Sequence, residues 1–373
     1  PRLGSAMKAH VWDGPGQPLS LMELREPEPK AGEVLVEVAA CGVCHSDLHV
    51  MGGAIPFPAP GVLGHEMSGR VLALGEGVSH VGVGDRVATT FIMPCGACPS
   101  CWRGQEELCE KFFGLNRLKG HLYDDTTRLF TLAGEPVAMY SMGALGQRSI
   151  VPATDVFRLP DNLPLPDAAV LGCAFFTAFG AVHTTAALSI GETVAVIGTG
   201  GVGLAILQIA KAVGASRIIA VDLADDKLAA ALANGATDTI NSSQLDPVAA
   251  VKEMVPGGVD AAFEAVGRGN TIVQAVQMVR EGGRVVPVGL AAGDATAGIP
   301  ITHLVRRKVQ LLGSFGARPR IDMPVVIELA AKGAIDLDAA VTRRYRFTEA
   351  NQAYADLSAG EITGRAIIDF TLG

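Results

Sequence analysis

Four closely spaced cysteines constrain this chain more than any other feature of its sequence. They fall within fifteen positions in the pattern Cys-x2-Cys-x2-Cys-x7-Cys, and the same segment carries the turn-forming residues Gly96, Pro99 and Gly104. Four thiolates at this spacing suit the closed tetrahedral coordination of a structural zinc ion, whereas free buried cysteines rarely cluster in this way. A redox Cys-x-x-Cys pair would explain only two of the four. The predicted ligands of this structural zinc are Cys95, Cys98, Cys101 and Cys109.

The charge and hydropathy of the chain argue against two kinds of partner. The net charge is -8, and no dense run of Lys and Arg offers a surface for nucleic acid. Glu106, Glu107 and Glu110 inside the cysteine segment likewise disfavour a nucleic-acid-binding zinc ribbon. The longest apolar stretch, 168–182, is short and interrupted by glycines. We therefore expect this stretch to pack inside the protein, with no membrane contact.

The start of the chain shows no charged segment followed by an apolar core, so no secretory signal is predicted and the expected location is the cytoplasm. In that reducing compartment seven cysteines, an odd number, are not expected to form a disulfide framework. Metal binding is the leading explanation for them. Residues Pro1 to Ala6 are left out of the fold prediction, because the strand-like pattern begins at Met7.

The pattern of apolar residues divides the 373-residue chain into two domains. Up to residue 174, short alternating runs such as Glu33 to Val38 are punctuated by Gly and Pro and predict a β-rich domain. Over 175–313, apolar strands alternate with helical stretches, which predicts the doubly wound parallel sheet of an α/β fold. We expect 314–373 to return to the first domain, with a helix at Met323 to Lys332 and a final strand at Ala366 to Phe370.

A glycine-rich turn in the second domain has the sequence context of a dinucleotide site. The turn directly follows the apolar strand Thr193 to Ile197 and opens the helical stretch 201–213. Its glycines permit close approach of a pyrophosphate to a helix N-terminus. Asp222 ends the next strand, nineteen residues after Gly203, where a carboxylate binds ribose hydroxyls and repels a ribose phosphate. The sequence thus favours NAD over NADP, bound by Gly198, Gly200, Gly201, Val202, Gly203 and Asp222, with Lys227 beside the same ribose.

A second set of metal-binding residue types lies in three separate segments: Cys41 to His49, Gly64-His65-Glu66, and Leu171-Gly172-Cys173. With these motifs, the cysteine cluster and the glycine-rich turn in this order, the sequence resembles the zinc-dependent alcohol dehydrogenases of the medium-chain dehydrogenase/reductase superfamily. The resemblance runs from Met7 to the C-terminus. It implies a GroES-like β-rich catalytic domain and a Rossmann NAD-binding domain.

The resemblance also implies the roles of individual residues. It places a catalytic zinc on Cys44, His65 and Cys173, which leaves one position open for water or substrate. Glu66 is similar to the family's acidic neighbour of zinc, and Asp47 to the carboxylate that orients the ligating histidine. A proton relay would run through Ser46 and His49. The remaining implied positions are His45 and Arg365 as pyrophosphate ligands, Thr177 beside the nicotinamide, and Phe91 in the substrate pocket. Cys41 is left over as a packed thiol.

With two zinc ions and NAD, the chain is predicted to be an enzyme. It would interconvert alcohols, mainly primary aliphatic or aryl alcohols, with aldehydes or ketones. The alternative within this class is a formaldehyde dehydrogenase acting on a thiol adduct, which would need a cationic pocket from residues such as Arg117, Lys119 or Arg128. A different class is a nucleotide-binding structural or regulatory protein that has lost catalysis, and the retained Cys44 and Ser46 argue against it. We expect a homo-oligomer, first a dimer and second a tetramer, formed by edge strands near 285–309.

Overall fold

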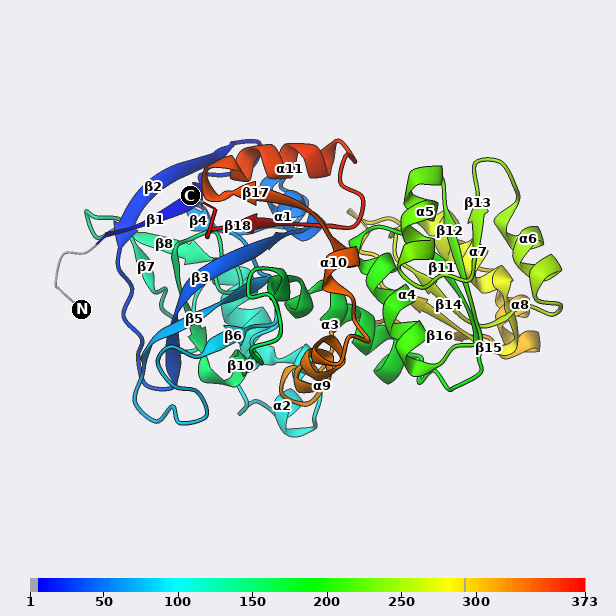
Figure 1. Cartoon of the computed structure of the whole chain (residues 1–373), viewed down its shortest axis with the longest axis horizontal. Coiled ribbons are helices and arrows are strands. Elements are labelled where there is room, and N and C mark those ends of the chain that lie inside the picture. The colour runs from blue at the N-terminus through cyan, green and yellow to red at the C-terminus, as the bar shows by residue number, and fades with distance from the viewer. Residues whose placement is uncertain (1–5, 292, 373) are drawn as a thin grey trace. The chain divides into compact units, whose positions relative to one another are not determined.

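The computed structural model describes residues 6–291 and 293–372 of the chain (Figure 1). Within it the chain forms two compact units. The first unit comprises Pro1–Cys173, Arg318–Ile327 and Arg343–Gly373, and the second comprises Ala174–Ala317 and Glu328–Thr342. The sequence analysis put the boundaries one and four residues away, at 174/175 and 313/314, and assigned all of 314–373 to the first domain. The structure instead gives 314–317 and 328–342 to the second unit.

The first unit is built mainly from two sheets, whose strands pair mostly antiparallel, with β4 (Gly61–Val62) and β8 (Pro136–Met139) as a parallel pair. The longer sheet centres on β3 (Glu33–Val43), in which every residue but Glu37 is buried. The alternating pattern of Glu33 to Val38 therefore marks a strand covered on both faces. The order of this sheet is β10 (Phe157–Arg158), β6 (Arg86–Ala88), β5 (Met67–Leu74), β3, β18 (Arg365–Asp369) and β17 (Val341–Arg346), with β9 (Arg148–Pro152) also paired to β3. The other order is β2 (Leu19–Arg25), β1 (Ala6–Trp12), β4, β8 and β7 (Leu129–Phe130).

Short helices in the first unit hold the segments that carry the predicted metal ligands. Those in the N-terminal half are α1 (His45–Met51), α2 (Pro99–Trp102), the 3-10 turns η1 (Glu106–Leu108) and η3 (Ala153–Asp155), the π-helical η2 (Phe112–Arg117), and η4 (Asp167–Gly172). The C-terminal part adds α9 (Pro319–Ala331), whose last four residues belong to the second unit, together with η6 (Phe347–Glu349) and α11 (Ala350–Ser358). The predicted helix at 323–332 corresponds to α9, whereas the sequence analysis did not predict α11. Ala6, which was left out of the fold prediction, opens β1, and Pro1 to Ser5 lie outside the described residues.

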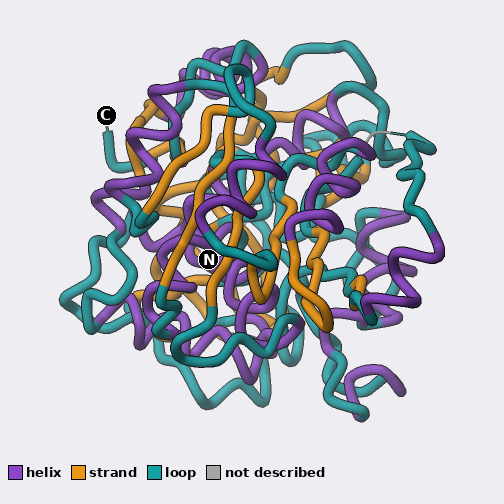
Figure 2. Tube along the Cα trace, turned by 90° about the vertical axis from the view of Figure 1, so that its right-hand side faces the viewer, coloured by secondary structure: helices purple, strands orange, loops and turns teal. Residues whose placement is uncertain are grey.

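The second unit is a six-stranded parallel sheet with flanking helices, as predicted (Figure 2). Its order is β13 (Asp238–Asn241), β12 (Arg217–Asp222), β11 (Thr193–Ile197), β14 (Val259–Glu264), β15 (Val279–Pro287) and β16 (Gln310–Leu311). This is the 3-2-1-4-5-6 order of a Rossmann sheet. The helices are α3 (Ala174–Phe179), η5 (Gly180–Thr185), α4 (Gly201–Val213), α5 (Asp225–Ala233), α6 (Pro247–Met254), α7 (Gly269–Met278), α8 (Ile301–Arg307) and α10 (Leu337–Ala340).

Two local features of the chain follow their sequence pattern. Pro287 is the last residue of β15, where its missing N-H interrupts no further ladder bond.

The apolar run 167–185 is long and apolar enough to cross a membrane by composition, but 78% of its apolar window is buried inside the structure. A core helix of a folded protein passes the same test, so this run is weak evidence for a membrane span.

Candidate active site

Three segments of the first unit bring Cys44, His65 and Cys173 together. Their ligand atoms all lie within 4.8 Å of one another, and all three residues are buried. Cys44 stands at the N-terminus of α1, His65 lies in the loop between β4 and β5, and Cys173 directly follows η4. The left-handed φ of +89° at Gly64 turns the chain just before His65. Residues 129 positions apart in the sequence thus form one cluster.

The imidazole of His65 is held for metal binding. Its Nδ1 pairs with Oδ1 of the fully buried Asp47 at 3.1 Å, and its Nε2, also buried, has no hydrogen-bond partner among the described residues. A buried polar atom without a partner is expected to bind something that the protein chain does not supply. Two sulfurs and one imidazole are suitable donors for zinc, and Asp47 orients the ligand in the way that carboxylates do at zinc sites.

The electrostatics of the two thiols point to the same conclusion. Hydrogen bonding from Cys173 lowers the pKa of Cys44 well below its usual value, with further help from the positive charges of His65 and Arg365, although burial opposes the shift. The pKa of Cys173 is raised well above its usual value by this shared hydrogen bond with Cys44 and by burial. Two neighbouring thiolates repel each other unless a cation lies between them. The cluster therefore fits a divalent metal ion.

Glu66 and Arg365 form a buried ion pair next to this cluster. Arg365 opens β18, which pairs with β3, and its guanidinium binds Oε2 of Glu66. Gly42 leaves the room that Glu66 needs, because a Cβ at Gly42 would lie 1.7 Å from Glu66 Oε2. The charges of Glu66, Cys44 and Cys173 raise the pKa of Arg365, although burial opposes them. This position is consistent with Glu66 as the acidic neighbour of a metal, and the role of Arg365 in pyrophosphate binding stays a prediction.

The residues of the predicted proton relay lie on α1. The Cys44 sulfur is 3.8 Å from the Ser46 hydroxyl, so Ser46 is beside the metal cluster. Ser46 and His49 are partly exposed and His45 is exposed. Their backbone positions on one short helix allow a path from the cluster toward solvent, while their roles in catalysis stay predictions.

Aromatic rings surround the imidazole of His65. The Phe91 ring, predicted for the substrate pocket, lies 6.2 Å from it between centroids, and the Tyr140 ring lies 5.8 Å away, both edge to face. The sequence analysis did not single out Tyr140, which comes from the segment after β8 and has no motif around it. Both rings are buried and give the neighbourhood of the cluster an apolar character.

Cys41 is close to these residues but belongs to neither metal cluster. Its side chain is fully buried, and burial, together with the charges of Asp47 and Glu66, raises the pKa of its thiol well above its usual value. The thiol donates to the Gly42 carbonyl at 3.4 Å. Cys41 is a packed thiol, as the sequence analysis expected.

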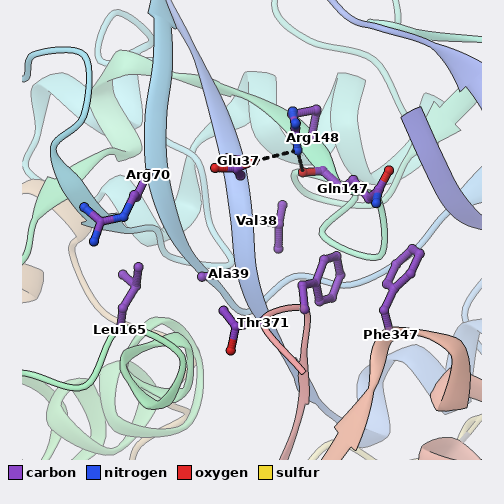
Figure 3. Close-up of a pocket in the computed structure, with 10 residues that line it drawn as sticks. Glu37, Val38, Ala39, Arg70, Gln147, Arg148, Leu165, Phe347 and Thr371 are labelled. Carbon is purple, nitrogen blue, oxygen red and sulfur yellow. Dashed lines mark hydrogen bonds and ion pairs between the residues drawn. The ribbon is translucent and has the colours of Figure 1, made fainter. Parts of the chain in front are cut away.

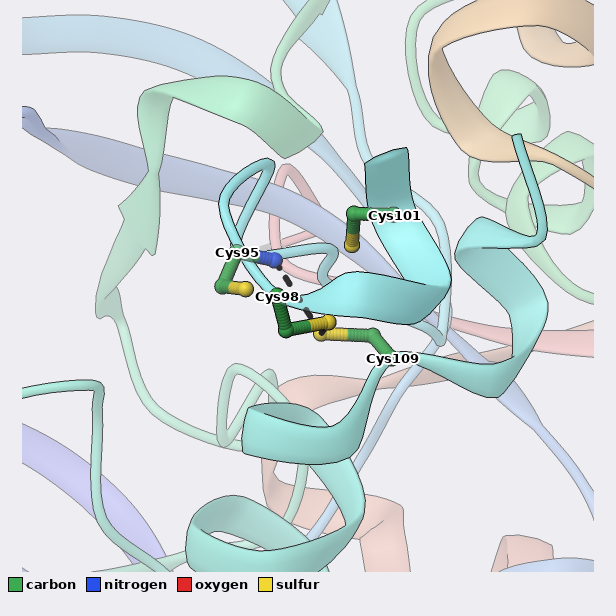
Figure 4. Close-up of side chains that lie close together, drawn as sticks. All are labelled: Cys95, Cys98, Cys101 and Cys109. Carbon is green, nitrogen blue, oxygen red and sulfur yellow. Dashed lines mark hydrogen bonds between the residues drawn. The ribbon is translucent and has the colours of Figure 1, made fainter. Parts of the chain in front are cut away.

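The second cluster consists of the predicted ligands of a structural zinc, Cys95, Cys98, Cys101 and Cys109 (Figure 4). Their sulfurs lie within 4.8 Å of one another, and three of the four residues are buried. Backbone N-H groups of Cys95 and Ala97 donate to the sulfurs of Cys109 and Cys95, at 3.2 and 3.4 Å. These bonds stabilise thiolates, and four thiolates form the closed donor set of a structural zinc.

The four thiols cannot all ionise without a cation. Burial alone would raise the pKa of Cys98, but backbone N-H groups of Cys101 and Glu110 and the neighbouring thiols lower it to about 6. Burial and the charge of a neighbouring cysteine raise the pKa of Cys109 to about 11 and that of Cys101 still further. Ionisation of one thiol thus makes ionisation of its neighbours less favourable, because the negative charges repel each other. A bound zinc ion offsets this repulsion.

The glycine-rich turn of the second unit joins β11 to α4. Gly198 has a left-handed φ of +87°, and a Cβ on Gly203 would lie 1.9 Å from the Gly198 carbonyl, so this turn needs both glycines. Gly200 caps α4 without a side-chain hydrogen bond, and a Cβ there would meet no protein atom within 4 Å. The N-H groups of the first helical turn, at Gly201, Val202 and Gly203, suit a phosphate.

Asp222 lies at the end of β12, directly beside this turn. Its Oδ2 accepts hydrogen bonds from the backbone N-H and the hydroxyl of Thr199, at 2.7 and 2.8 Å, and its Oδ1 accepts one from Leu223 N-H. The sequence analysis did not single out Thr199, although it lies inside the motif. Lys227 is partly buried on α5, and Thr177 is buried on α3.

Each of the cations named for a thiol-adduct substrate contacts other side chains of the first unit. Arg128 is buried and paired with Glu33, and Lys119 is paired with Asp125 at 2.8 Å. The guanidinium of Arg117 stacks over the rings of Tyr140 and Phe112, with its carbon 4.0 and 5.0 Å from the ring centres. Two of the three charges are therefore already balanced by carboxylates.

A separate cavity of about 230 Å³ lies in the first unit (Figure 3). None of the predicted site residues lines it. Its two arginines are already bound, Arg148 to Glu26 and Glu37 and Arg70 to the Gly84 carbonyl. Its other lining residues are Val38, Ala39, Gln147, Leu165, Phe347, Phe370 and Thr371. This cavity is therefore not the candidate active site.

The fold and these residues define a class of protein: a β-rich unit with two zinc-type sites, followed in the chain by a Rossmann unit. Family models agree with this division. An alcohol dehydrogenase GroES-like domain matches residues 30–161, and a zinc-binding dehydrogenase domain matches residues 201–332.

Individual relatives match nearly the whole chain. An S-(hydroxymethyl)glutathione dehydrogenase of Photobacterium damsela subsp. piscicida is 36% identical over 93% of this chain and 95% of its own. An alcohol dehydrogenase zinc-binding domain protein from Burkholderia ambifaria is 34% identical with a TM-score of 0.93, over 98% of this chain and 99% of the other. A benzyl alcohol dehydrogenase from Acinetobacter calcoaceticus is 32% identical with a TM-score of 0.92, over the same shares. This chain belongs to the zinc-dependent alcohol dehydrogenases of the medium-chain dehydrogenase/reductase superfamily, and it is an oxidoreductase of that family.

Proposed function

We propose that this protein is an NAD-dependent alcohol dehydrogenase with two zinc ions per chain, which interconverts primary aliphatic or aryl alcohols and their aldehydes. The observation that carries the proposal is the cluster of Cys44, His65 and Cys173, in which His65 offers a buried Nε2 without a partner among the described residues. Three protein ligands leave a fourth position for substrate, as in catalytic zinc sites. When bound there, zinc supplies a Lewis acid that polarises the carbon-oxygen bond.

The residues of the chain supply binding and proton transfer. Oxidation of an alcohol by NAD⁺ gives an aldehyde, NADH and one proton, and Ser46 and His49 are the proposed carriers of that proton. Phe91 and Tyr140 form an apolar, aromatic surrounding for His65, which favours apolar substrates over sugars. The similarity to a benzyl alcohol dehydrogenase supports an aryl substrate.

NAD is the proposed cofactor because Asp222 stands at the end of the second strand of the Rossmann sheet. A carboxylate at this position accepts the hydroxyl protons of the adenosine ribose and repels a phosphate on the same ribose. The first turn of α4 and the residues His45, Thr177, Lys227 and Arg365 are the further proposed contacts of NAD.

A second candidate function is the oxidation of a formaldehyde-thiol adduct, which the 36% identity to an S-(hydroxymethyl)glutathione dehydrogenase favours. The ion pairs of Arg128 and Lys119 argue against this second function, because those two charges already pair with carboxylates of the protein and are not available to bind the carboxylates of a thiol substrate such as glutathione. A turnover assay decides between the two functions. The zinc-replete protein with NAD is expected to oxidise benzyl alcohol without thiol. Turnover only with formaldehyde plus glutathione would replace our proposal by the second candidate, and no turnover with either would contradict both.

We further propose that the protein is a homodimer formed through β16, with a tetramer as the alternative. This short strand is the last of the parallel sheet, and Leu311 on it is 43% exposed. The neighbouring α8 has no buried residue and exposes Ile301 and Val305, one helical turn apart. An exposed strand edge next to apolar side chains favours pairing with a second copy. The cytoplasmic location stays a prediction.

A further inference from the structure

The carboxylate that orients His65 is itself held by a residue from the far end of the chain. Asp47 is fully buried, and its Oδ1 accepts hydrogen bonds from His65 Nδ1 at 3.1 Å and from the Gly64 N-H at 3.2 Å. Its other oxygen, Oδ2, accepts the phenol hydroxyl of Tyr354 at 2.9 Å. Tyr354 lies on α11, 307 residues after Asp47, and α11 packs against α1 (Figure 1).

We propose that Tyr354 is a positioning residue of the catalytic metal site, which acts through Asp47 on His65. This inference rests on the proposed function, since it concerns the metal held by Cys44, His65 and Cys173. Tyr354 touches Asp47 and is not a member of the metal cluster, so it is not a catalytic residue. It acts through a chain of two hydrogen bonds, from Tyr354 to Asp47 and from Asp47 to His65.

The physical reason lies in the burial of the carboxylate. A buried ionised oxygen without a donor is unfavourable, so the carboxylate turns toward whatever donor remains. With the Tyr354 hydroxyl present, each oxygen of Asp47 has its own donors, and the plane of the carboxylate is fixed. Without that hydroxyl, Oδ2 competes with Oδ1 for the N-H groups of Gly64 and His65, and the imidazole loses its fixed orientation. The ring of Tyr354 is 2% exposed and cannot be replaced by bulk water without rearrangement.

The substitution Tyr354→Phe tests this inference because it removes only the hydroxyl. A matched control is available in Tyr345→Phe. Tyr345 is also buried and also donates to a carboxylate, that of Asp356 on α11, at 2.6 Å, but this pair does not contact the metal cluster. Both substitutions remove one buried Tyr-to-Asp hydrogen bond at the same helix. An effect on the metal site that only Tyr354→Phe produces cannot come from a general loosening of α11.

The first measurement is zinc release from the purified full-length proteins to a coloured chelator. The four-cysteine site serves as an internal reference. Loss of a direct partner of a ligand weakens metal binding about 10- to 100-fold, and Tyr354 is one bond further away, so we expect release from the three-ligand site to be about three- to tenfold faster in Tyr354→Phe. Release in Tyr345→Phe should equal wild type. The second measurement is the visible absorption of the cobalt-substituted proteins, in which the bands of the three-ligand site should shift in Tyr354→Phe alone.

A double-mutant cycle shows whether the effect passes through Asp47. In an Asp47→Ala background the Tyr354 hydroxyl has no carboxylate to hold, so the further change Tyr354→Phe should alter zinc release less than about twofold. Equal effects of Tyr354→Phe in both backgrounds would overturn the proposal. So would release rates and cobalt spectra identical to wild type, or a Tyr354→Phe protein that loses both metals or its circular dichroism, because the hydroxyl would then hold the fold and not the metal site.

These outcomes separate the inference from the proposed function. If wild type binds only about one zinc per chain, the proposed function is wrong and the inference is overturned with it. If wild type binds two zinc ions and oxidises alcohols while Tyr354→Phe releases zinc like wild type, the inference alone is wrong.

Discussion

Individual hydrogen-bond donors in this molecule determine the orientation of two carboxylates, those of Asp47 and Asp222. A carboxylate offers about four acceptor positions. At Asp222, three of these are occupied, two by Thr199 and one by the Leu223 N-H. The carboxylate is therefore held in one orientation before any cofactor binds, with one position left on Oδ1.

This arrangement predicts that Thr199 tunes NAD affinity. In Thr199→Val the backbone bond remains but the hydroxyl bond is lost, and a hydrogen bond to a charged group contributes about 1.5–3 kcal/mol. Because part of this is recovered by water, we expect the KM for NAD to rise about five- to tenfold, with kcat changed less than about twofold, since the adenosine ribose is remote from the reacting carbon. Steady-state kinetics at saturating alcohol measure both constants.

Thr199→Ser, which keeps the hydroxyl, is the control and should stay within about twofold of wild type. If valine and serine give the same KM for NAD, the hydroxyl does not aim Asp222. A large fall of kcat in Thr199→Val alone would place its effect at the reacting centre instead.

Most residues of the two metal sites could be predicted from the sequence, and some of their partners could not. Cys95 and its three neighbours are close in the chain, so their spacing alone indicates a shared ion. Cys44, His65 and Cys173 come from separate segments and were identified by resemblance. Tyr354 and Tyr140 carry no motif, and their contacts with Asp47 and His65 exist only after long-range folding.

At the scale of elements, the strands and helices with strong apolar periodicity were predicted well. The helix predicted over 201–213 is α4 (Gly201–Val213), between a buried strand and Gly214 in the left-handed conformation. Several shorter helices were not predicted, α6 and α11 among them. For α11 the apolar residues Ala350, Ala353, Tyr354 and Leu357 do follow the spacing of a helix face, and this signal was overlooked. For α6 a start signal was present and overlooked: Asp246 precedes Pro247 at the first helical position.

The cap of α6 gives a prediction at this scale. The Asp246 side chain accepts from the N-H groups of Val248 and Ala249, at 2.9 and 3.2 Å. Loss of such a cap costs about 1 kcal/mol, so in Asp246→Ala the amides of α6 should exchange about fivefold faster with deuterium. Native-state hydrogen exchange of a peptide covering 247–254 measures this. Asp246→Ser keeps a capping oxygen and should exchange like wild type, and equal rates in all three proteins would show that the cap does not limit the opening of α6.

At the scale of the whole molecule, the predicted metal ligands and the glycine-rich turn lie in different units. All seven metal ligands belong to the first unit, and the glycine-rich turn and Asp222 belong to the second. The sequence predicted these two units but placed 328–342 in the first, because this segment lies between two stretches, Arg318–Ile327 and Arg343–Gly373, that do return to the first unit.

The exposed edge of the parallel sheet gives a prediction about assembly. If β16 forms the dimer contact, Leu311→Arg should place a charge in an apolar interface and convert the dimer to a monomer, with a dissociation constant raised at least about tenfold. Analytical ultracentrifugation over a range of concentrations measures this. Val83→Arg, on the first unit and also exposed, is the control and should leave the dimer intact. A monomeric wild type, or a Leu311→Arg protein that remains dimeric, would contradict assembly through this edge.

The return of the chain to the first unit has a consequence for the order in which the molecule is made. Cys44, His65 and Cys173 are synthesised long before Tyr354 and Arg365, which follow Cys173 in the chain by 181 and 192 residues. Until those later residues have been made, Asp47 and Glu66 lack the partners that hold them in the folded protein. The three metal ligands are therefore present during synthesis well before the surroundings of their cluster are complete.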